Sequence, residues 1–245
     1  MEKYSRNPTI DTMLNHASCR NFTDEKVSDE DIAAIFRAAQ SASTSCFLQV
    51  TSIIRITEQA LKEKVAVLAG NQKHVAQAPE LWIFCADYHR NQVEFPESDL
   101  GWNEQFLVGI QDAGIMAQNA FAALESLGLG GCYIGGIRNG IQEIDRLLAL
   151  PKNVFPVFGL AFGHPAEHAG LKPRMPAAVT FMENSYREPD PEVMKRYNEL
   201  MRKYYESRSS NAKNVDWTEN MIGYMKKERR TYMKDYVQDK GWDLK

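Results

Sequence analysis

Cysteine is scarce in this chain, and no two cysteines form a CxxC pair. The four that occur, Cys19, Cys46, Cys85 and Cys132, are widely spaced. This spacing argues against a structural zinc site or a disulfide scaffold and favours a reducing compartment. The chain also has no apolar run long enough to span a bilayer and no apolar segment typical of a signal peptide near its start. We therefore expect a cytoplasmic protein with no metal site and no membrane partner.

A large excess of one charge is also missing. The chain has 29 Lys and Arg against 32 Asp and Glu, a formal net charge of −3. This balance argues against nucleic acid as a partner. With 245 residues and a hydrophobic fraction of 44%, the chain is long enough for one large domain or two small ones. We expect residues 1–245 to form a single domain, with 190–245 as a helical C-terminal extension.

Several common catalytic motifs do not occur. The sequence contains no GxxxxGK[ST], no HExxH and no GxSxG. The stretch Gly128-Leu129-Gly130-Gly131-Cys132-Tyr133 superficially resembles a dinucleotide fingerprint. That fingerprint needs a strand before it, a helix after it and glycine at its last position. Here a helical pattern precedes, a strand pattern follows and Tyr133 stands last, so we exclude a Rossmann fold.

The elements that are present predict a mixed α and β fold. Strand patterns cover residues 50–56, the continuously apolar 81–86, the glycine-rich 130–136 and the apolar 157–162. Helical patterns begin after Ser28, run from 104 to 127 with Gly128 as a stop, occur around 144–148, and begin again at Asp190-Pro191. We predict a sheet, rich in antiparallel strands, that is flanked by helices.

The helix expected over 104–127 has a face of mixed residue sizes. That face comprises Leu107, Ile110, Gly114, Ala117, Phe121 and Leu124. The pattern fits a simple buried core helix or close packing against another helix or subunit. The later helix carries Tyr197, Leu200, Tyr204 and Tyr205, which must also be buried, and a neighbouring subunit is one place for them.

Fixed positive charge and small donors occur together in two distant segments. They are His16-Ala17-Ser18-Cys19-Arg20 and Lys172-Pro173-Arg174, and the glycine-rich strand lies between them. Such groups suit a phosphate or an anionic ring, and glycine lets a flat ligand approach the backbone. Taken singly, each has a simpler role: His16 as a helix cap, Ser18 as a turn hydroxyl, Arg20 as a surface ion-pair partner. Their joint occurrence favours a flavin site.

In combination these motifs resemble the nitroreductase family, in particular its NADPH-dependent, oxygen-insensitive members and NADPH–flavin oxidoreductases. The resemblance begins with His16-x-Ser18-x-Arg20 followed by Asn21-Phe22-Thr23-Asp24-Glu25. It continues to the C-terminal Gly241-Trp242 through residues 45–49, 70–78, 84–87, 125–131, 133–138, 171–174, 183–186 and 204–205.

The resemblance implies a three-layer nitroreductase-like α+β fold and a homodimer with FMN at the subunit interface. It implies that Arg20 lies near the flavin pyrimidine, that a backbone N–H, that of Gly135, lies near N5, and that Lys172 and Arg174 meet the phosphate. The full set of FMN-binding residues that it implies is His16, Ala17, Ser18, Cys19, Arg20, Ser43, Thr44, Ser45, Gln72, Tyr133, Ile134, Gly135, Gly136, Lys172 and Arg174.

The resemblance also implies a ping-pong reaction in which NADPH is the hydride donor and a nitroaromatic, a quinone or free flavin is the acceptor. No side chain is expected to act as an acid or base, because flavin N5 carries the chemistry. Arg208 matches an arginine assigned to the NADPH 2′-phosphate. Lys227, Arg230 and Cys46 fall on the expected substrate side.

Two positions depart from the family pattern. Ala17 stands where Arg is frequent, which removes one cation near the phosphate, and Cys46 stands where Ser is frequent. Alternatives also stay open: a specialised flavin reductase or reductive dehalogenase of the same fold, or a non-catalytic flavin-binding or sensory protein, which would not need Arg208.

Overall fold

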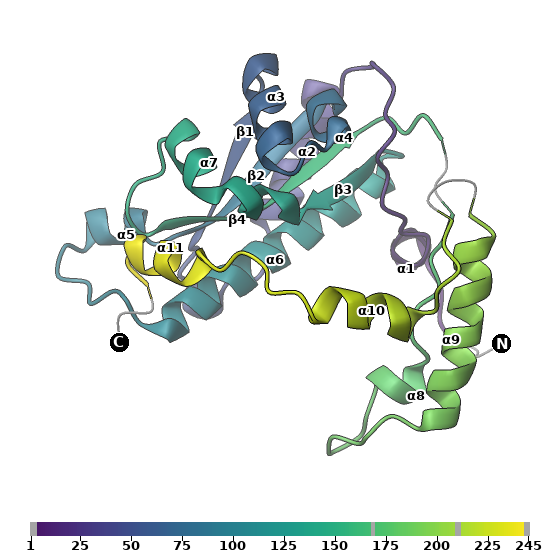
Figure 1. Cartoon of the computed structure of the whole chain (residues 1–245). Coiled ribbons are helices and arrows are strands. Elements are labelled where there is room, and N and C mark those ends of the chain that lie inside the picture. The colour runs from purple at the N-terminus through teal and green to yellow at the C-terminus, as the bar shows by residue number, and fades with distance from the viewer. Residues whose placement is uncertain (1–3, 168–169, 209–211, 243–245) are drawn as a thin grey trace. The chain divides into compact units, whose positions relative to one another are not determined.

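The protein is described by a computed structural model that covers residues 4–167, 170–208 and 212–242. It contains two compact units (Figure 1). The first comprises residues 1–169 together with 232–245, and the second comprises 170–231. The C-terminal residues therefore belong to the first unit. A single domain with an extension from residue 190 stays a prediction.

The first unit combines four strands with most of the helices. The strands are β1 (Thr51–Ile56), β2 (Glu80–Asp87), β3 (Gly130–Ile134) and β4 (Val154–Gly163). The α-helices are α1 (Pro8–Leu14), α2 (Asp29–Gln40), α3 (Gln59–Leu68), α4 (Lys73–Gln77), α5 (His89–Glu94), α6 (Asn103–Ser126), α7 (Ile141–Leu147) and α11 (Met233–Asp239). Two 3₁₀ turns, η1 (Ser45–Phe47) and η2 (Gly135–Gly140), complete it.

The four strands form one sheet in the order β1-β2-β4-β3, and every neighbouring pair is antiparallel. The central strands β2 and β4 are almost wholly buried, which explains their continuous apolar sequences. Trp82, Phe84 and Phe162 face one side of the sheet and Leu81, Ile83 and Ala161 the other. The predicted antiparallel α+β fold is confirmed.

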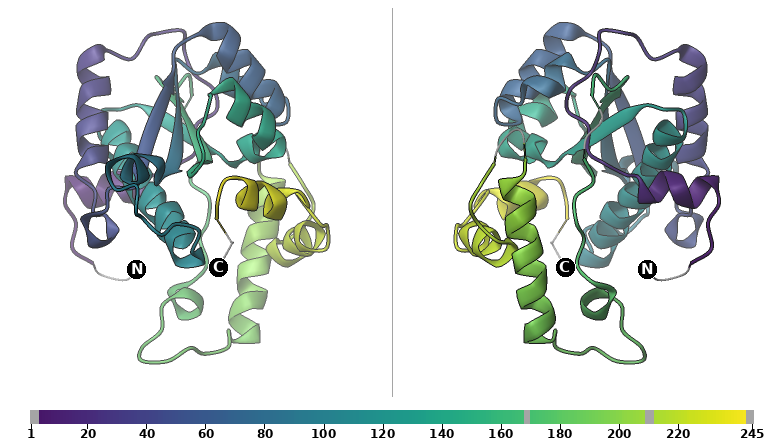
Figure 2. Two further views of the ribbon diagram at one scale, coloured as in Figure 1. Left: turned by 90° about the vertical axis from the view of Figure 1, so that its left-hand side faces the viewer. Right: turned by 90° about the vertical axis from the view of Figure 1, so that its right-hand side faces the viewer.

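Helices cover both faces of the sheet and make three layers (Figure 2). Ile35 and Ala39 of α2 and Phe121 and Leu124 of α6 pack on one face. Val65 of α3 and residues of α4, η2 and α7 pack on the other. Ser28 caps α2 by accepting a hydrogen bond from Asp31 N, as its sequence predicts.

Within this chain, helix α6 buries only part of the stripe predicted for it. Ala117, Phe121 and Leu124 are buried as expected, but Leu107 is 62% exposed, and a Cβ on Gly114 would meet no atom within 4 Å. Gly109 makes the close approach instead, since a Cβ there would lie 2.8 Å from the Cβ of Ala86. Residues 109, 113, 117 and 120 follow the helix period and face inward. The face of α6 that this chain buries is therefore rotated by part of a turn from the predicted stripe.

The glycine-rich segment is a strand only up to Ile134. Residues 135–140 turn into η2, so the strand predicted over 130–136 is two residues too long. At the other end of the sheet, the C-terminal segment returns to the first unit. Tyr236 Oη donates to Asp145 Oδ2 at 2.5 Å and Lys240 Nζ pairs with the same oxygen at 2.7 Å. Trp242 is fully buried beside Tyr88.

The second unit is helical and consists of α8 (Ala177–Thr180), α9 (Pro191–Glu206) and α10 (Trp217–Met225). Asp190 caps α9 and Pro191 occupies its first turn, as predicted. Tyr197, Met201 and Tyr205 are buried within this unit, whereas Leu200 is 49% exposed. Tyr197 and Tyr205 therefore need no second subunit to cover them.

Candidate functional site

The segment from His16 to Arg20 leaves α1 and is fixed to α6 and β3. His16 Nδ1 lies 2.8 Å from Oε1 of Glu125, and its ring meets Phe121 edge-on at 4.8 Å between centroids. Cys19 N donates to the carbonyl of Gly131 at 2.8 Å. A Cβ on Gly130 would lie 2.8 Å from the Cβ of Cys19, so glycine is what allows this approach.

Arg20 supplies an exposed cation at this place. It forms no ion pair with a carboxylate among the described residues. Burial lowers the pKa of His74, and the charge of Arg20 lowers it further. The same charge opposes the burial that raises the pKa of the Cys132 thiol. Nε2 of His74 is buried without a hydrogen-bond partner in the described part of the chain. An anion beside Arg20 is therefore compatible with the local charge.

Gln72 and the start of η2 form the next part of the site. Gln72 Nε2 donates to the carbonyl of Ala69 at 2.6 Å. A Cβ on Gly136 would overlap both of these groups, so the backbone at Gly136 lies against them only because it lacks a side chain. The Arg138 guanidinium reaches back to within 3.3 Å of a Cβ position on Gly135, and its Nη1 donates to Val157 O at 2.5 Å.

The side chains of Tyr133 and Ile134 belong to the core. The Tyr133 ring lies 5.0 Å from Phe121 and 5.3 Å from Phe158 between centroids, and burial raises its pKa well above the usual range. Ile134 is 1% exposed. A ligand at this stretch would therefore meet backbone groups, not these two side chains.

The loop that carries Ser43, Thr44, Ser45 and Cys46 is bound to Asp112 of α6, apart from the His16–Arg20 segment and Gln72. Ser45 N donates to both carboxylate oxygens of Asp112, at 3.2 and 3.1 Å, and Ser45 Oγ donates to Oδ1 at 3.1 Å. Ser43 and Cys46 are exposed, and Thr44 Oγ1 is buried without a partner among the described residues. None of the hydrogen bonds described above joins this loop to His16, Arg20, Gln72 or Gly136.

Asp112 lies in none of the sequence motifs, and Glu125 lies in a matching stretch but has no role predicted from it. Both are acidic residues on the inner side of α6, and Asp112 is only 1% exposed. A carboxylate on an otherwise apolar helix face needs hydrogen-bond donors. An acidic residue on the apolar face of this helix is therefore the sequence feature that could have indicated the two contacts. The donors themselves come from Ser45 and His16, which are 67 and 109 positions away.

The five cations expected around the phosphate, the nucleotide and the substrate all belong to residues 170–231. Lys172 Nζ lies 5.6 Å from the centroid of the Tyr205 ring, within cation–π range. Arg174 is exposed, and its charge opposes the burial that raises the pKa of Tyr197. Lys172 thus lies against Tyr205, whereas Arg174 acts on Tyr197.

The other three cations lie further along this unit. Arg208 is half-buried directly after α9, Lys227 is exposed after α10, and Arg230 is half-buried with a φ of 54°. Ser209, Ser210 and Asn211, which complete the polar loop around Arg208, lie outside the described residues.

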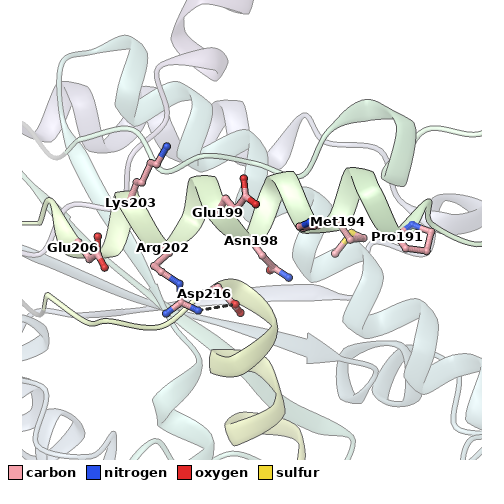
Figure 3. Close-up of a pocket in the computed structure, with 9 residues that line it drawn as sticks. Pro191, Met194, Asn198, Glu199, Arg202, Lys203, Glu206 and Asp216 are labelled. Atoms are coloured by element: carbon pink, nitrogen blue, oxygen red, sulfur yellow. Dashed lines mark hydrogen bonds and ion pairs between the residues drawn. The ribbon is translucent and has the colours of Figure 1, made fainter.

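A groove of about 640 Å³ runs along α9 (Figure 3). Its charged lining is mixed, with Lys195, Glu199, Lys203 and Glu206. Arg202 points across it to Asp216, with an N–O distance of 3.0 Å, and also pairs with Glu219 at 2.9 Å. No residue expected to bind FMN or NADPH lines this groove, and its cations alternate with acids. We therefore do not place the nucleotide site here.

Metal-ligating clusters and bilayer-spanning helices are both absent from residues 4–167, 170–208 and 212–242. Over these ranges, no cluster of three or more His, Cys, Asp and Glu side chains is arranged to hold a metal ion. No helix in the same ranges combines the length and apolar character needed to cross a bilayer.

Comparison with known proteins gives full-length matches. The nitroreductase family model matches residues 13–164, and that of the nitroreductase family C-terminal domain matches residues 172–245. The chain is 48% identical over 235 residues to an oxygen-insensitive NADPH nitroreductase of Salmonella typhimurium, covering 96% of this chain and 98% of the relative. It is 42% identical to an NADPH-flavin oxidoreductase of Vibrio harveyi, with the same coverage.

Solved structures agree with this result. Nitroreductase A from Vibrio parahaemolyticus superposes with a TM-score of 0.94 at 39% identity, covering 98% of this chain and all of the other. The NADPH:FMN oxidoreductase from Vibrio harveyi, complexed with NAD⁺, superposes with a TM-score of 0.92 at 39% identity, again over 98% of this chain.

Proposed function

Since the chain belongs to the nitroreductase family of oxidoreductases, we propose that it binds FMN and transfers hydride from NADPH to nitroaromatics, quinones or free flavin. The observation that carries the proposal is the convergence of the segment His16–Arg20, Gln72 and the glycines of β3 and η2. Cys19 bonds to Gly131, Gln72 lies against Gly136, and Arg20 has no carboxylate partner in the described ranges.

These residues fit the chemistry of a flavin. Arg20 offers a fixed cation for the pyrimidine, where the reduced ring carries negative charge. A Cβ on Gly136 would overlap Gln72 Nε2 and the carbonyl of Ala69, so glycine there lets the backbone of η2 lie directly against Gln72. Thr44 Oγ1 and His74 Nε2 are buried polar atoms without protein partners in the described chain, and a polar ligand would satisfy such groups. Lys172 and Arg174 would supply the phosphate charges.

When bound, FMN would accept hydride from NADPH and deliver it to the acceptor in a ping-pong sequence. The chain's own residues would bind and orient. Ser18, Arg20, Gln72 and the Gly135 backbone would hold the ring, Arg208 would hold the 2′-phosphate, and Lys227, Arg230 and Cys46 would face the substrate. No side chain needs to move a proton to the cofactor in this scheme.

A homodimer would complete the site. Glu125, which holds His16, and Asp112, which holds Ser45, are thirteen residues apart on α6, or about 20 Å along the axis at 1.5 Å per residue. One flavin would not easily reach both segments of a single chain, whereas a second copy could supply the Ser43–Ser45 loop. Light scattering on dilute holoprotein should give a dimer mass. A monomer that retains FMN would argue against an interface site.

Steady-state kinetics would test the function directly. Purified protein would be assayed with NADPH against a panel of nitroaromatic, quinone and flavin acceptors. Parallel double-reciprocal lines are expected for a ping-pong sequence, with turnover on more than one acceptor. Turnover restricted to free flavin would favour a dedicated flavin reductase. An absence of turnover with retained flavin would favour a binding or sensory protein.

A further inference from the structure

One buried carboxylate on α6 has no cation to balance it. Asp112 is 1% exposed, and no Lys, Arg or His pairs with it in the described part of the chain. Among the described residues, its hydrogen-bond donors all come from Ser45: two hydrogen bonds from the backbone N–H and one from the hydroxyl. A buried charge needs such donors, so Asp112 and the loop depend on each other.

The environment of Asp112 makes this dependence sharper. The buried hydroxyl of Tyr88 is without a partner among the described residues. Burial, together with the negative charge of Asp112, raises the pKa of Tyr88 to about 12. Ala113 beside Asp112 is fully buried, and Gly109 packs closely on Ala86. The Asp112 carboxylate therefore lies in a closely packed part of the core. The N–H and hydroxyl of Ser45 are its hydrogen-bond donors among the described residues.

The loop beyond Ser45 has an unusual backbone. Cys46, Phe47 and Gln49 have φ values of 48°, 58° and 54°, in the left-handed region that side chains other than glycine rarely adopt. Phe47 is 81% exposed and Leu48 is 40% exposed. Arg90 Nη2 donates to Gln49 O at 2.7 Å and Asn91 Nδ2 donates to Leu48 O at 3.4 Å. The loop is thus held from two sides in a costly conformation.

We propose that Asp112 is a positioning residue for acceptor binding: through its hydrogen bonds to Ser45 it holds Cys46, Phe47 and Gln49 in the left-handed conformation that presents Cys46 and Phe47 to the acceptor. This inference rests on the proposed function, because it assigns the loop to the substrate side of the flavin. Without Asp112, the left-handed residues would relax toward ordinary backbone conformations and the presented surface would be lost. The expected consequence is weaker acceptor binding by the FMN-loaded protein.

The test compares Asp112→Asn with Asp145→Asn. Both carboxylates accept several hydrogen bonds and both are largely buried, but Asp145 holds Tyr236 and Lys240 instead of the loop. We expect Asp112→Asn to raise the KM for a nitroaromatic acceptor about tenfold, with kcat per bound FMN changed less than about twofold. Asp145→Asn should lower the melting temperature and leave that KM unchanged. Equal KM values in wild type and Asp112→Asn would overturn the proposal.

A rescue variant tests the backbone argument. Gln49→Gly should recover part of the acceptor affinity in the Asp112→Asn background, because glycine adopts positive φ at little cost. If Asp112→Asn does not fold, Ser45→Ala, which removes only the hydroxyl bond, must by itself raise the KM by about threefold. An unchanged KM in Ser45→Ala would then contradict the proposal.

The proposed function can fail separately. If wild-type protein holds no FMN and oxidises no NADPH, the function is wrong and the assignment to acceptor binding falls with it. The positioning role of Asp112 is then tested by measuring the rate at which a maleimide labels Cys46. A severalfold change in Asp112→Asn, reversed in part by Gln49→Gly, supports a loop held by Asp112, and an unchanged rate refutes it.

Discussion

Oε1 of Glu125 accepts a hydrogen bond from Nδ1 of His16 at 2.8 Å, across 109 positions of sequence. The same carboxylate accepts a hydrogen bond from the backbone of Ala17. Burial raises the pKa of Glu125, and the charge and hydrogen bond of His16 oppose that increase. The last turn of α6 thus fixes the start of the segment proposed to bind FMN.

Replacing Glu125 by Gln should weaken FMN retention. The amide keeps the shape of the side chain but loses the charge, and a charge-assisted hydrogen bond contributes about 1.5–3 kcal/mol. We expect the Kd for FMN to rise roughly tenfold or more, measured by fluorescence as flavin is released on dilution. Glu30→Gln, an exposed change in the first turn of α2, is the control and should leave the Kd unchanged.

Replacing Gly136 by Ala should damage both stability and cofactor binding. The new Cβ would overlap Gln72 Nε2 and the carbonyl of Ala69, and such overpacking costs about 1–3 kcal/mol. The melting temperature should fall by several degrees and the FMN content of the purified protein should drop. Gly223→Ala in α10, where a Cβ meets no atom within 4 Å, should be neutral or slightly stabilising. A fully loaded Gly136→Ala protein would show that the packing of Gly136 against Gln72 is not needed for FMN binding.

Replacing Arg20 by Ala should lower the midpoint potential of the bound flavin. The fixed cation stabilises the negative charge of the reduced ring, and losing about 1.5–3 kcal/mol of this interaction corresponds to roughly 30–60 mV for a two-electron couple. A redox titration with a reference dye measures the shift. Lys26→Ala removes another exposed cation nearby in sequence and serves as control. An unchanged midpoint in Arg20→Ala would show that the role assigned to Arg20 is wrong.

Much of the fold could be predicted because its determinants are local. The continuously apolar β2 and β4 and the capping residues Ser28 and Asp190 identify their elements without knowledge of distant residues. The end of β3 could not be predicted, because Gly135 and Gly136 fit a strand as well as the turn they form. The part of α6 that this chain itself buries near Gly109 could not be predicted either, since Gly109 packs inward against Ala86 and carries no hydrophobic side chain to indicate it.

The site was predicted less completely, for a similar reason. His16, Arg20 and Gln72 are recognisable from motifs, but the residues that hold them come from far along the chain. Asp112 meets Ser45 across 67 positions, and no local pattern links the two. The left-handed backbone at Cys46, Phe47 and Gln49 is equally unpredictable, because residues of these types seldom adopt it.

Replacing Arg208 by Ala should change the choice of nucleotide. NADPH differs from NADH only by its 2′-phosphate, so one charge-assisted contact of about 1.5–3 kcal/mol can set the preference. We expect kcat/KM for NADPH to fall roughly ten- to a hundredfold, while the value for NADH and the bound FMN stay nearly unchanged. Equal losses with both nucleotides would indicate that Arg208 has a structural role instead.

The most direct test of the proposed function is an anaerobic titration of the FMN-loaded protein with NADPH, with no acceptor present. Our account predicts that the visible absorbance of the oxidised flavin bleaches in proportion to added NADPH and is complete at one NADPH per flavin. Subsequent addition of a nitroaromatic or quinone should restore the absorbance. A protein that binds FMN but keeps its absorbance under excess NADPH would contradict the account.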